Sequence, residues 1–271
     1  MRPGVDFIEE GKNDRQIVTD RAISENNVTP PERKKRFLLL VDGNARDLFA
    51  TGMILQRLEY DVYVSGSAED ALDIMANALP TLVIADVRLP RMSGADLLKR
   101  IKQEPITAPI PVILLSSIAD PRTEELCLAY GCASFLKKPV EPESLYYAVQ
   151  HASEAAPRSY VRLKTFLRAE VGGRPASVGP RDPEMITALS ENGCYVRTLT
   201  PRTVNSIHSV EFILERTPIK ARAEVLYAFE MNKGPFKEPG MGMKFSAIPD
   251  ADRQRIRNFI KDQITKDIHA P

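Results

Sequence analysis

The feature that most constrains the fold of this chain is a run of branched apolar residues, 82–85, that ends in a carboxylate, Asp86. A continuous apolar run of this length is typical of a strand buried on both faces of a parallel sheet. A second run, 37–41, also ends in an acid, Asp42. In open parallel sheets, functional groups gather beyond the carboxyl ends of the strands. We therefore expect Asp42 and Asp86 to lie close together at one sheet edge.

The rest of the first half alternates between short apolar runs and amphipathic stretches. Strands are predicted over 37–41, 62–64, 82–86, 111–115 and 133–136. Helices are predicted over 44–58, 120–131 and 142–152, and two more are predicted to begin at Ser67 and at Ser93. This spacing is typical of βαβ units with right-handed crossovers. The predicted fold is an α/β doubly wound, five-stranded parallel sheet with helices on both faces. Ser116 ends the fourth strand and Lys138 follows the fifth, so both are expected at the edge that carries the two acids.

These side chains predict a chemistry for that edge. A carboxylate such as Asp86 can attack a phosphoryl donor and become an acyl phosphate. The transferred group carries spread negative charge, which the Lys138 ammonium and the Ser116 hydroxyl could stabilise. Asp42 could help to hold Mg2+, which prefers oxygen ligands.

Residues 36–152 resemble the receiver domain of response regulators, a CheY-like, flavodoxin-like fold. The resemblance is carried by Leu-Val-Asp42, by Asp86 followed by Leu89-Pro90 and Ser93-Gly94, by Leu-Leu-Ser116-Ser117, and by Phe135-Leu-Lys-Lys138-Pro139. It implies that a histidine kinase phosphorylates Asp86 and that Ser116 and Phe135 are switch residues. It also implies a Mg2+ site formed by Asp42, Asp86 and the backbone carbonyl of Arg88, and a cis peptide bond before Pro139.

One departure weakens the implied metal site. Receiver domains usually carry two adjacent acids after the first strand, whereas Gly43 follows Asp42 here. Weak Mg2+ binding is therefore expected, unless Asp47 compensates from the first helical turn. The alternative is a receiver fold kept as a docking platform. A dehalogenase-type phosphatase would need a second Asp where Arg88 stands, so we do not expect an enzyme.

The second half changes from helical to alternating periodicity. Strands are predicted over 161–171, 185–187, 194–199, 210–214, 221–229 and 240–245, and a closing helix from Asp250. Six strands and a terminal helix in about 110 residues suggest a small antiparallel barrel.

Residues 158–267 resemble the PilZ domain. The resemblance is carried by Arg158-xxx-Arg162, by the turn 188–193 and by Pro239-Gly240-Met-Gly242-Met-Lys-Phe245. It implies binding of cyclic di-GMP by Arg158, Arg162, Ser190 and Gly193. Arginine forks match phosphate oxygens and the guanine O6/N7 edge. The turn normally begins with Asp or Asn, and Ala188 stands there instead, which predicts weaker binding.

These patterns divide the chain into a flexible tail (1–34), a receiver domain (35–155) and a PilZ-like domain (156–271). Residues 35–157 hold 12 basic and 16 acidic residues, and 158–271 hold 19 and 13, so an acidic half precedes a basic one. The three cysteines form no CxxC pair, no signal peptide begins the chain and no apolar run reaches membrane-span length, which indicates a cytoplasmic protein. No helix-turn-helix pattern appears after residue 157, so we do not expect DNA binding.

The predicted function is that of a two-component response regulator with a PilZ output domain. Its predicted partners are a histidine kinase, cyclic di-GMP and an unidentified downstream protein, and a homodimer is an option. The rival interpretation is a protein-interaction scaffold in which the phosphorylation and nucleotide sites are both degenerate.

Overall fold

The computed structural model of the chain describes residues 37–118, 120–173, 184–233 and 238–268. The predicted N-terminal tail, 1–34, lies outside these residues. No helix in the described part of the chain is both long and apolar enough to cross a membrane.

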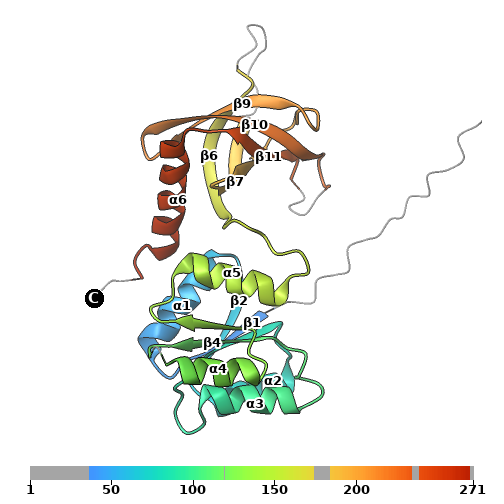
Figure 1. Cartoon of the computed structure of the whole chain (residues 1–271). Coiled ribbons are helices and arrows are strands. Elements are labelled where there is room, and N and C mark those ends of the chain that lie inside the picture. Colours follow the sequence, from blue (N-terminus) through green and yellow to red (C-terminus); the bar gives the residue numbers. More distant parts are fainter. Residues whose placement is uncertain (1–36, 119, 174–183, 234–237, 269–271) are drawn as a thin grey trace, which may run out of the picture. The chain divides into compact units, whose positions relative to one another are not determined.

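Strands and helices alternate in the first domain (Figure 1). The elements in chain order are β1 (Phe37–Val41), α1 (Ala45–Arg57), β2 (Asp61–Ser65), α2 (Ala68–Asn77), β3 (Leu82–Asp86), α3 (Gly94–Gln103), β4 (Val112–Ser116), α4 (Pro121–Ala129), β5 (Ser134–Lys137) and α5 (Pro142–Ser153). The strands are parallel in the order β2-β1-β3-β4-β5. The order reverses at β1 and β3, so their carboxyl ends flank a topological switch point, the usual place of a site in such sheets.

Both faces of this sheet are covered, which explains the uninterrupted apolar runs of the central strands. Alternate residues of each strand point to opposite faces. Leu38 and Leu40 of β1 pack in the layer of α1 and α5, whereas Leu39 and Val41 pack in the layer of α2, α3 and α4. All five residues of each of β1, β3 and β4 are buried.

The helices begin where polar side chains cap them. Asn44, Ser67, Ser93 and Asp120 each accept hydrogen bonds from backbone amides of the first turn that follows. Such caps satisfy amides that have no partner within the helix. Their positions also fix where each loop at the carboxyl edge of the sheet ends.

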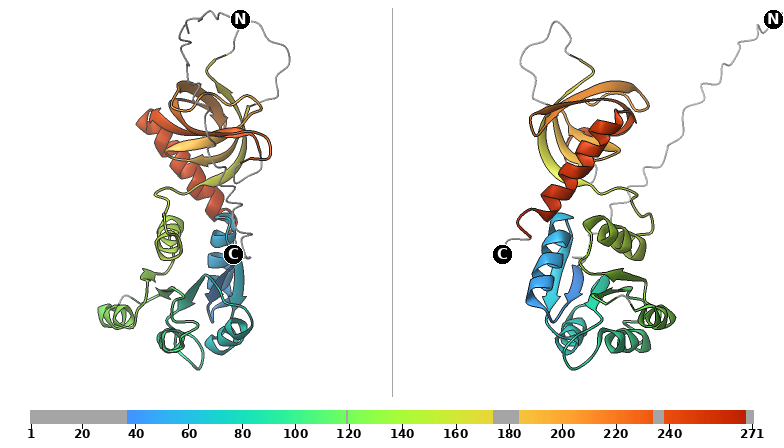
Figure 2. Two further views of the ribbon diagram at one scale, coloured as in Figure 1. Left: turned by 90° about the vertical axis from the view of Figure 1, so that its right-hand side faces the viewer. Right: turned by 60° about the vertical axis from the view of Figure 1, so that its left-hand side comes forward.

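The second domain is a closed antiparallel barrel followed by a helix. Its elements are β6 (Leu163–Val171), β7 (Glu184–Ser190), β8 (Gly193–Arg197), β9 (Ile207–Leu214), β10 (Thr217–Phe229), β11 (Gly240–Ala247) and α6 (Asp250–Thr265). The strand order around the barrel is β10-β11-β8-β7-β6-β9. Figure 2 shows the barrel wall from two further sides, with α6 running along it.

Helix α6 is joined to the turn between β7 and β8. Arg257 forms a salt bridge of 2.5 Å with Glu191, and the Arg253 guanidinium donates a 3.0 Å hydrogen bond to the Glu191 carbonyl. Ile256, Ile260 and Ile264 are buried on one face of α6, as their spacing predicts. The turn that carries the predicted nucleotide residues is therefore held from outside the sheet.

The structure confirms the predicted fold class, a five-stranded parallel α/β sheet followed by a six-stranded barrel and a helix. The largest difference lies in β10, which begins at Thr217 rather than at 221. Pro218 argues against a strand in the sequence, but here it pairs with Ile213 next to the short β9–β10 turn.

Candidate functional site

The first candidate site is a group of acids at the carboxyl edge of the parallel sheet. Asp86 ends β3 and Asp42 directly follows β1, and these two strands are paired neighbours. Their exposed fractions are only 5% and 2%. Backbone amides fix one oxygen of each, because Asn44 N donates to Asp42 Oδ1 (2.9 Å) and Arg88 N donates to Asp86 Oδ1 (2.6 Å). The structure thus brings the two predicted acids together.

Lys138, just beyond β5, lies among these carboxylates. Its ammonium donates hydrogen bonds to Oδ2 of Asp42 and of Asp86, and to Oδ2 of Asp47 at 3.0 Å. The peptide bond between Lys138 and Pro139 is cis, as the resemblance implied. Three carboxylates around one ammonium leave an excess of negative charge, which favours a further cation at this site.

Burial and ion pairing shift the pKa values of Asp42 and Lys138 in opposite directions. Burial raises the pKa of the Asp42 carboxyl above its ordinary value, although the hydrogen bonds from Lys138 and from the Asn44 amide lower it. Burial alone would lower the pKa of Lys138, but its hydrogen bonds to the three carboxylates outweigh this effect and the pKa is raised. Lys138 is therefore held in its charged form.

Asp47 is a third acid of this site, which the sequence named only as a possible compensation for Gly43. It lies in the first turn of α1, and its side chain is 42% exposed, whereas the side chain of Asp42 is 1% exposed. Asp42, Asp47 and Asp86 each offer an oxygen, and these oxygens lie within 4.8 Å of one another. This all-oxygen donor set suits Mg2+.

The structure also gives a reason for the missing acid at position 43. A Cβ atom on Gly43 would lie 2.9 Å from Cδ of Pro90, closer than such contacts normally come. Because the proline ring is rigid, an aspartate at position 43 would require the loop after β3 to shift.

The other predicted residues of this domain lie around the acids. The Ser116 hydroxyl is buried at the end of β4, where it donates to the Ile118 carbonyl (2.8 Å). Phe135 is half-buried on β5 and packs on the α2–α4 side of the sheet. Arg88 follows Asp86, and its guanidinium donates to the Ser117 hydroxyl, a contact between two loops that the sequence did not predict.

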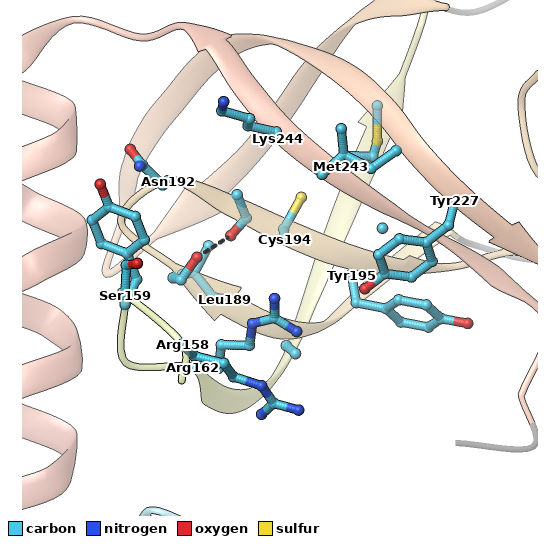
Figure 3. A pocket seen from close by; sticks show the side chains of 16 residues that line it. Arg158, Ser159, Arg162, Leu189, Asn192, Cys194, Tyr195, Tyr227, Met243 and Lys244 are labelled. Atoms are coloured by element: carbon cyan, nitrogen blue, oxygen red, sulfur yellow. Dashed lines mark hydrogen bonds between the residues drawn. The ribbon is translucent and has the colours of Figure 1, made fainter. Parts of the chain in front are cut away.

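The second candidate site is a pocket of about 240 Å³ on the barrel (Figure 3). It is lined by all four residues predicted to bind the nucleotide, Arg158, Arg162, Ser190 and Gly193. The two arginines belong to the connector, which we define as residues 154–162 between α5 and β6. Lys244 adds a third cation, and no acid is among the described residues that line the pocket. The charge of this pocket favours an anionic ligand.

The two arginines keep their charge available. Both are exposed, and in the part of the chain that the structure describes neither forms a salt bridge with a carboxylate. Figure 3 shows both guanidinium groups projecting from the connector toward the pocket. They are placed to meet phosphate or guanine oxygens without first breaking an ion pair.

Ser190 and Gly193 serve the turn itself. The Ser190 hydroxyl donates to the Gly193 carbonyl (3.0 Å), which leaves its oxygen lone pairs for an incoming donor. A Cβ on Gly193 would overlap the Met243 carbonyl of β11. This glycine therefore permits the close approach of the neighbouring strand β11.

Several pocket residues were not predicted. Tyr195, Tyr227 and Lys244 line the pocket, as does Ala188, which the sequence singled out only as a departure. The alternation of β8 and β10 could have indicated which side of each strand faces outward, but not which outward residues meet across the sheet.

Comparison with known proteins assigns the first domain to a family. The model of the response regulator receiver domain matches residues 38–150. The chain is 34% identical over 118 residues to the two-component response regulator ORR3 of Oryza sativa subsp. indica, covering 43% of this chain and 89% of that protein. It is 34% identical over 110 residues to ORR7 of subsp. japonica, where the match covers 40% of this chain and 52%, about half, of that protein. A crystal structure of a putative response regulator from Chloroflexus aurantiacus J-10-fl is 32% identical, with a TM-score of 0.43, over 44% of this chain and 98% of that one.

Proposed function

This chain belongs to the family of two-component response regulators, and from this premise we propose that it accepts a phosphoryl group on Asp86 and that its barrel binds cyclic di-GMP. Phosphorylation of Asp86 is supported mainly by the contact of the Lys138 ammonium with the two buried acids, Asp42 and Asp86. Cyclic di-GMP binding is supported mainly by the pocket, in which Arg158 and Arg162, which form no salt bridge with the described carboxylates, lie beside the 190–193 turn.

At the first site, a carboxylate oxygen of Asp86 would attack the phosphorus of the donor, and the bond from phosphorus to the donor's leaving group would break. The negative charge of the transferred group needs cations at its oxygens. Lys138 supplies one such charge at a distance already set by its contact with Asp86. A histidine kinase is the expected donor, and a small acyl phosphate can replace it in a test.

The oxygens of Asp42, Asp47 and Asp86 would hold Mg2+, which supplies further positive charge to the phosphoryl oxygens when bound. Binding of the ion near Lys138 would require the ammonium to give up part of its contact with the acids. The chain's own residues thus set a competition between Lys138 and the metal for the same carboxylates.

Phosphorylation can be tested by incubating the full chain with acetyl phosphate and Mg2+ and by measuring its mass. We expect one phosphoryl group on the wild type and none on Asp86→Asn. Asp73→Asn, which changes an acid on the exposed part of α2, is the matched control and should be phosphorylated normally. A wild-type chain that stays unmodified by acetyl phosphate, and that binds no beryllofluoride, would favour the docking-platform interpretation.

The barrel pocket supports a ligand that carries both phosphates and flat bases. Arginine guanidinium groups bind phosphate oxygens and the guanine edge bidentately and can also stack on a base. The volume of about 240 Å³ is below the usual range for a drug-sized ligand, so the pocket would enclose only part of a cyclic dinucleotide. The exposed connector arginines would hold the part that remains outside.

Isothermal titration of the full chain with cyclic di-GMP tests whether the barrel pocket binds this ligand. Arg162→Ala removes a charge-assisted contact of about 1.5–3 kcal/mol, which corresponds to a loss of roughly 10–150-fold in affinity. Arg168→Ala, an exposed arginine of β6 that does not line the pocket, should leave the affinity unchanged. Absence of binding by the wild type at high ligand concentration would favour the interaction-scaffold function instead.

A further inference from the structure

The Gly240-Met241-Gly242 segment of β11 provides space for two tyrosine rings. A Cβ atom on Gly242 would overlap three ring carbons of Tyr227, Cζ, Cε1 and Cε2. A Cβ on Gly240 would lie 2.9 Å from Cε1 and Cζ of Tyr195. Each ring therefore lies close against the backbone of β11, in the space that a side chain would otherwise fill.

The register of the barrel explains this arrangement. Gly242 pairs with Tyr227 of β10 on one side and with Tyr195 of β8 on the other, and Tyr195 in turn pairs with Ala188 of β7. Directly paired residues point to the same face of a sheet. All four residues of this row line the pocket. Their face is opposite to the one that buries Cys194, Val196, Met241 and Met243 in the barrel core.

The two rings form one aromatic wall. The centroids of Tyr195 and Tyr227 are 6.4 Å apart, with an angle of 28° between the ring planes. The ring centroids of Phe229 and Tyr227 are 5.3 Å apart. The Tyr195 hydroxyl donates a 3.0 Å hydrogen bond to the Glu238 carbonyl. Figure 3 shows the two rings next to each other at one end of the pocket, with the Arg158 and Arg162 guanidinium groups nearby. The pocket thus combines a supported aromatic surface with cationic planar groups.

We propose that Tyr227 is a base-stacking residue, which places a purine ring of the anionic ligand against the aromatic wall. This inference rests on the proposed function for the presence of a nucleotide, and it adds the contact that recognises the base. Proteins bind unpaired bases by stacking them on aromatic rings, and arginine planes act in the same way. At position 188 an alanine contributes no hydrogen bond, so stacking carries more of the recognition of the base in this chain.

A purely structural role for Tyr227 makes a different prediction. An aromatic ring placed over a cross-strand glycine stabilises a sheet by itself. In that case, replacing Tyr227 would lower the stability of the barrel but would leave the affinity of the folded protein for nucleotides unchanged.

The test is isothermal titration of the full chain with two probes, cyclic di-GMP and GMP, for the wild type, Tyr227→Phe and Tyr227→Leu. Stacking on an aromatic side chain is worth about 1–3 kcal/mol per base, so Tyr227→Leu should weaken binding by roughly 5–150-fold. Tyr227→Phe keeps the ring and should bind within about twofold of the wild type, a difference well below that stacking energy. Equal affinity of the folded Leu variant and the wild type would overturn the proposal.

The two probes separate this proposal from the proposed function. If cyclic di-GMP fails to bind but GMP binds in a Tyr227-dependent way, the dinucleotide is wrong and the stacking residue stands. If the wild type binds cyclic di-GMP with no dependence on Tyr227, the proposed function stands and the stacking role is wrong. If the wild type binds neither probe, both fall.

A measurement on the wild-type side chains covers the case in which the Leu variant does not fold. The chain has eight tyrosines and no tryptophan, so 3-fluorotyrosine labelling gives a small set of fluorine NMR signals. The signal that disappears in Tyr227→Phe belongs to Tyr227. A stacked base should shift this signal by its ring current, whereas signals of tyrosines in the first domain, such as Tyr63, should stay in place. An unshifted Tyr227 signal at saturating nucleotide would contradict stacking.

Discussion

Asp47 adds a third carboxylate to the acidic site of a chain in which Gly43 stands in place of the second acid of the receiver motif. Gly43 leaves no carboxylate next to Asp42, and Pro90 restricts the space for one. One helical turn further on, the Asp47 carboxylate reaches the Lys138 ammonium at 3.0 Å and lies with those of Asp42 and Asp86. The acid is supplied by a helix start rather than by a strand end.

This arrangement predicts that Asp47→Asn weakens Mg2+ binding. The asparagine keeps the shape of the side chain but removes one of three negative charges, and we expect the affinity to fall by at least roughly tenfold, the lower end of losses seen for residues that support metal ligands. Calorimetric titration with Mg2+, or electron paramagnetic resonance with Mn2+, measures it. Asp73→Asn should bind the ion as the wild type does, and equal affinity of Asp47→Asn would contradict the assignment.

Asp42 makes a second prediction at this scale, concerning stability and pH. Its pKa is raised mainly by burial, so the folded state favours the protonated acid, and the ionised form opposes folding at neutral pH. Asp42→Asn should therefore raise the free energy of unfolding at neutral pH, because Lys138 keeps its salt bridges with Asp47 and Asp86 when Asp42 loses its charge. The gain should shrink as the pH falls through the raised pKa toward 3.8, where the wild-type acid becomes neutral.

Urea denaturation at neutral and mildly acidic pH measures this difference. Asp96→Asn is a control of opposite sign, because the hydrogen bond from Ser93 lowers the pKa of Asp96. The stability that Asp96 contributes is present above the ordinary pKa of an aspartate, so its replacement should lower the free energy of unfolding at neutral pH. A destabilised Asp42→Asn would show that the pair with Lys138 outweighs the cost of burial.

Among the secondary-structure elements, the start of α3 lies directly against the end of β3. A Cβ on Gly94, the first residue of α3, would overlap the carbonyl oxygen of Asp86, and the Gly94 amide donates to the Val87 carbonyl (2.9 Å). The Ser93-Gly94 pair of the receiver motif thus combines a helix cap with a residue that has no side chain.

We expect Gly94→Ala to be destabilising and to impair phosphorylation of Asp86. Overpacking of this kind typically costs about 1–3 kcal/mol, because α3 or β3 must move. Gly66→Ala is the matched control in the same domain, since an added Cβ there meets nothing within 4 Å. Thermal unfolding and the acetyl phosphate reaction measure the two effects, and equal behaviour of both variants would contradict the close fit.

The helices and strands, and the acids at the strand ends, could be predicted because each is encoded by a short stretch of sequence. An apolar run that ends in an acid fixes both the strand and the side chain at its end, as for Asp86. Asp47 and the tyrosine row could not be assigned in the same way. The contact of Asp47 with Lys138 joins residues 91 positions apart. The row of Tyr195, Gly242 and Tyr227 depends on strand register, which shifts between Val225 and Tyr227. No short-range pattern encodes such a shift.

At the scale of the whole molecule, the connector is both a link between the domains and part of the wall of the barrel pocket. Arg158 and Arg162 line the pocket, and only residues 154–162 separate α5 from β6. A ligand that binds these arginines together with the barrel would restrict the connector. Because the connector is short, restricting it would change the range of orientations that the receiver domain samples relative to the barrel.

Small-angle scattering of the full chain should therefore change when cyclic di-GMP is added. We expect a shift in the distribution of interatomic distances at the lengths that span both domains, and no shift for Arg162→Ala at a ligand concentration that saturates the wild type. Arg168→Ala, whose side chain lies outside the pocket, should respond as the wild type does. Identical curves with and without ligand, in a sample that calorimetry shows to be saturated, would mean that the ligand binds without moving the domains. A response regulator with such a barrel would then have to transmit its signal through the pocket surface itself, where the bound nucleotide adds two phosphates to a face that carries three cations.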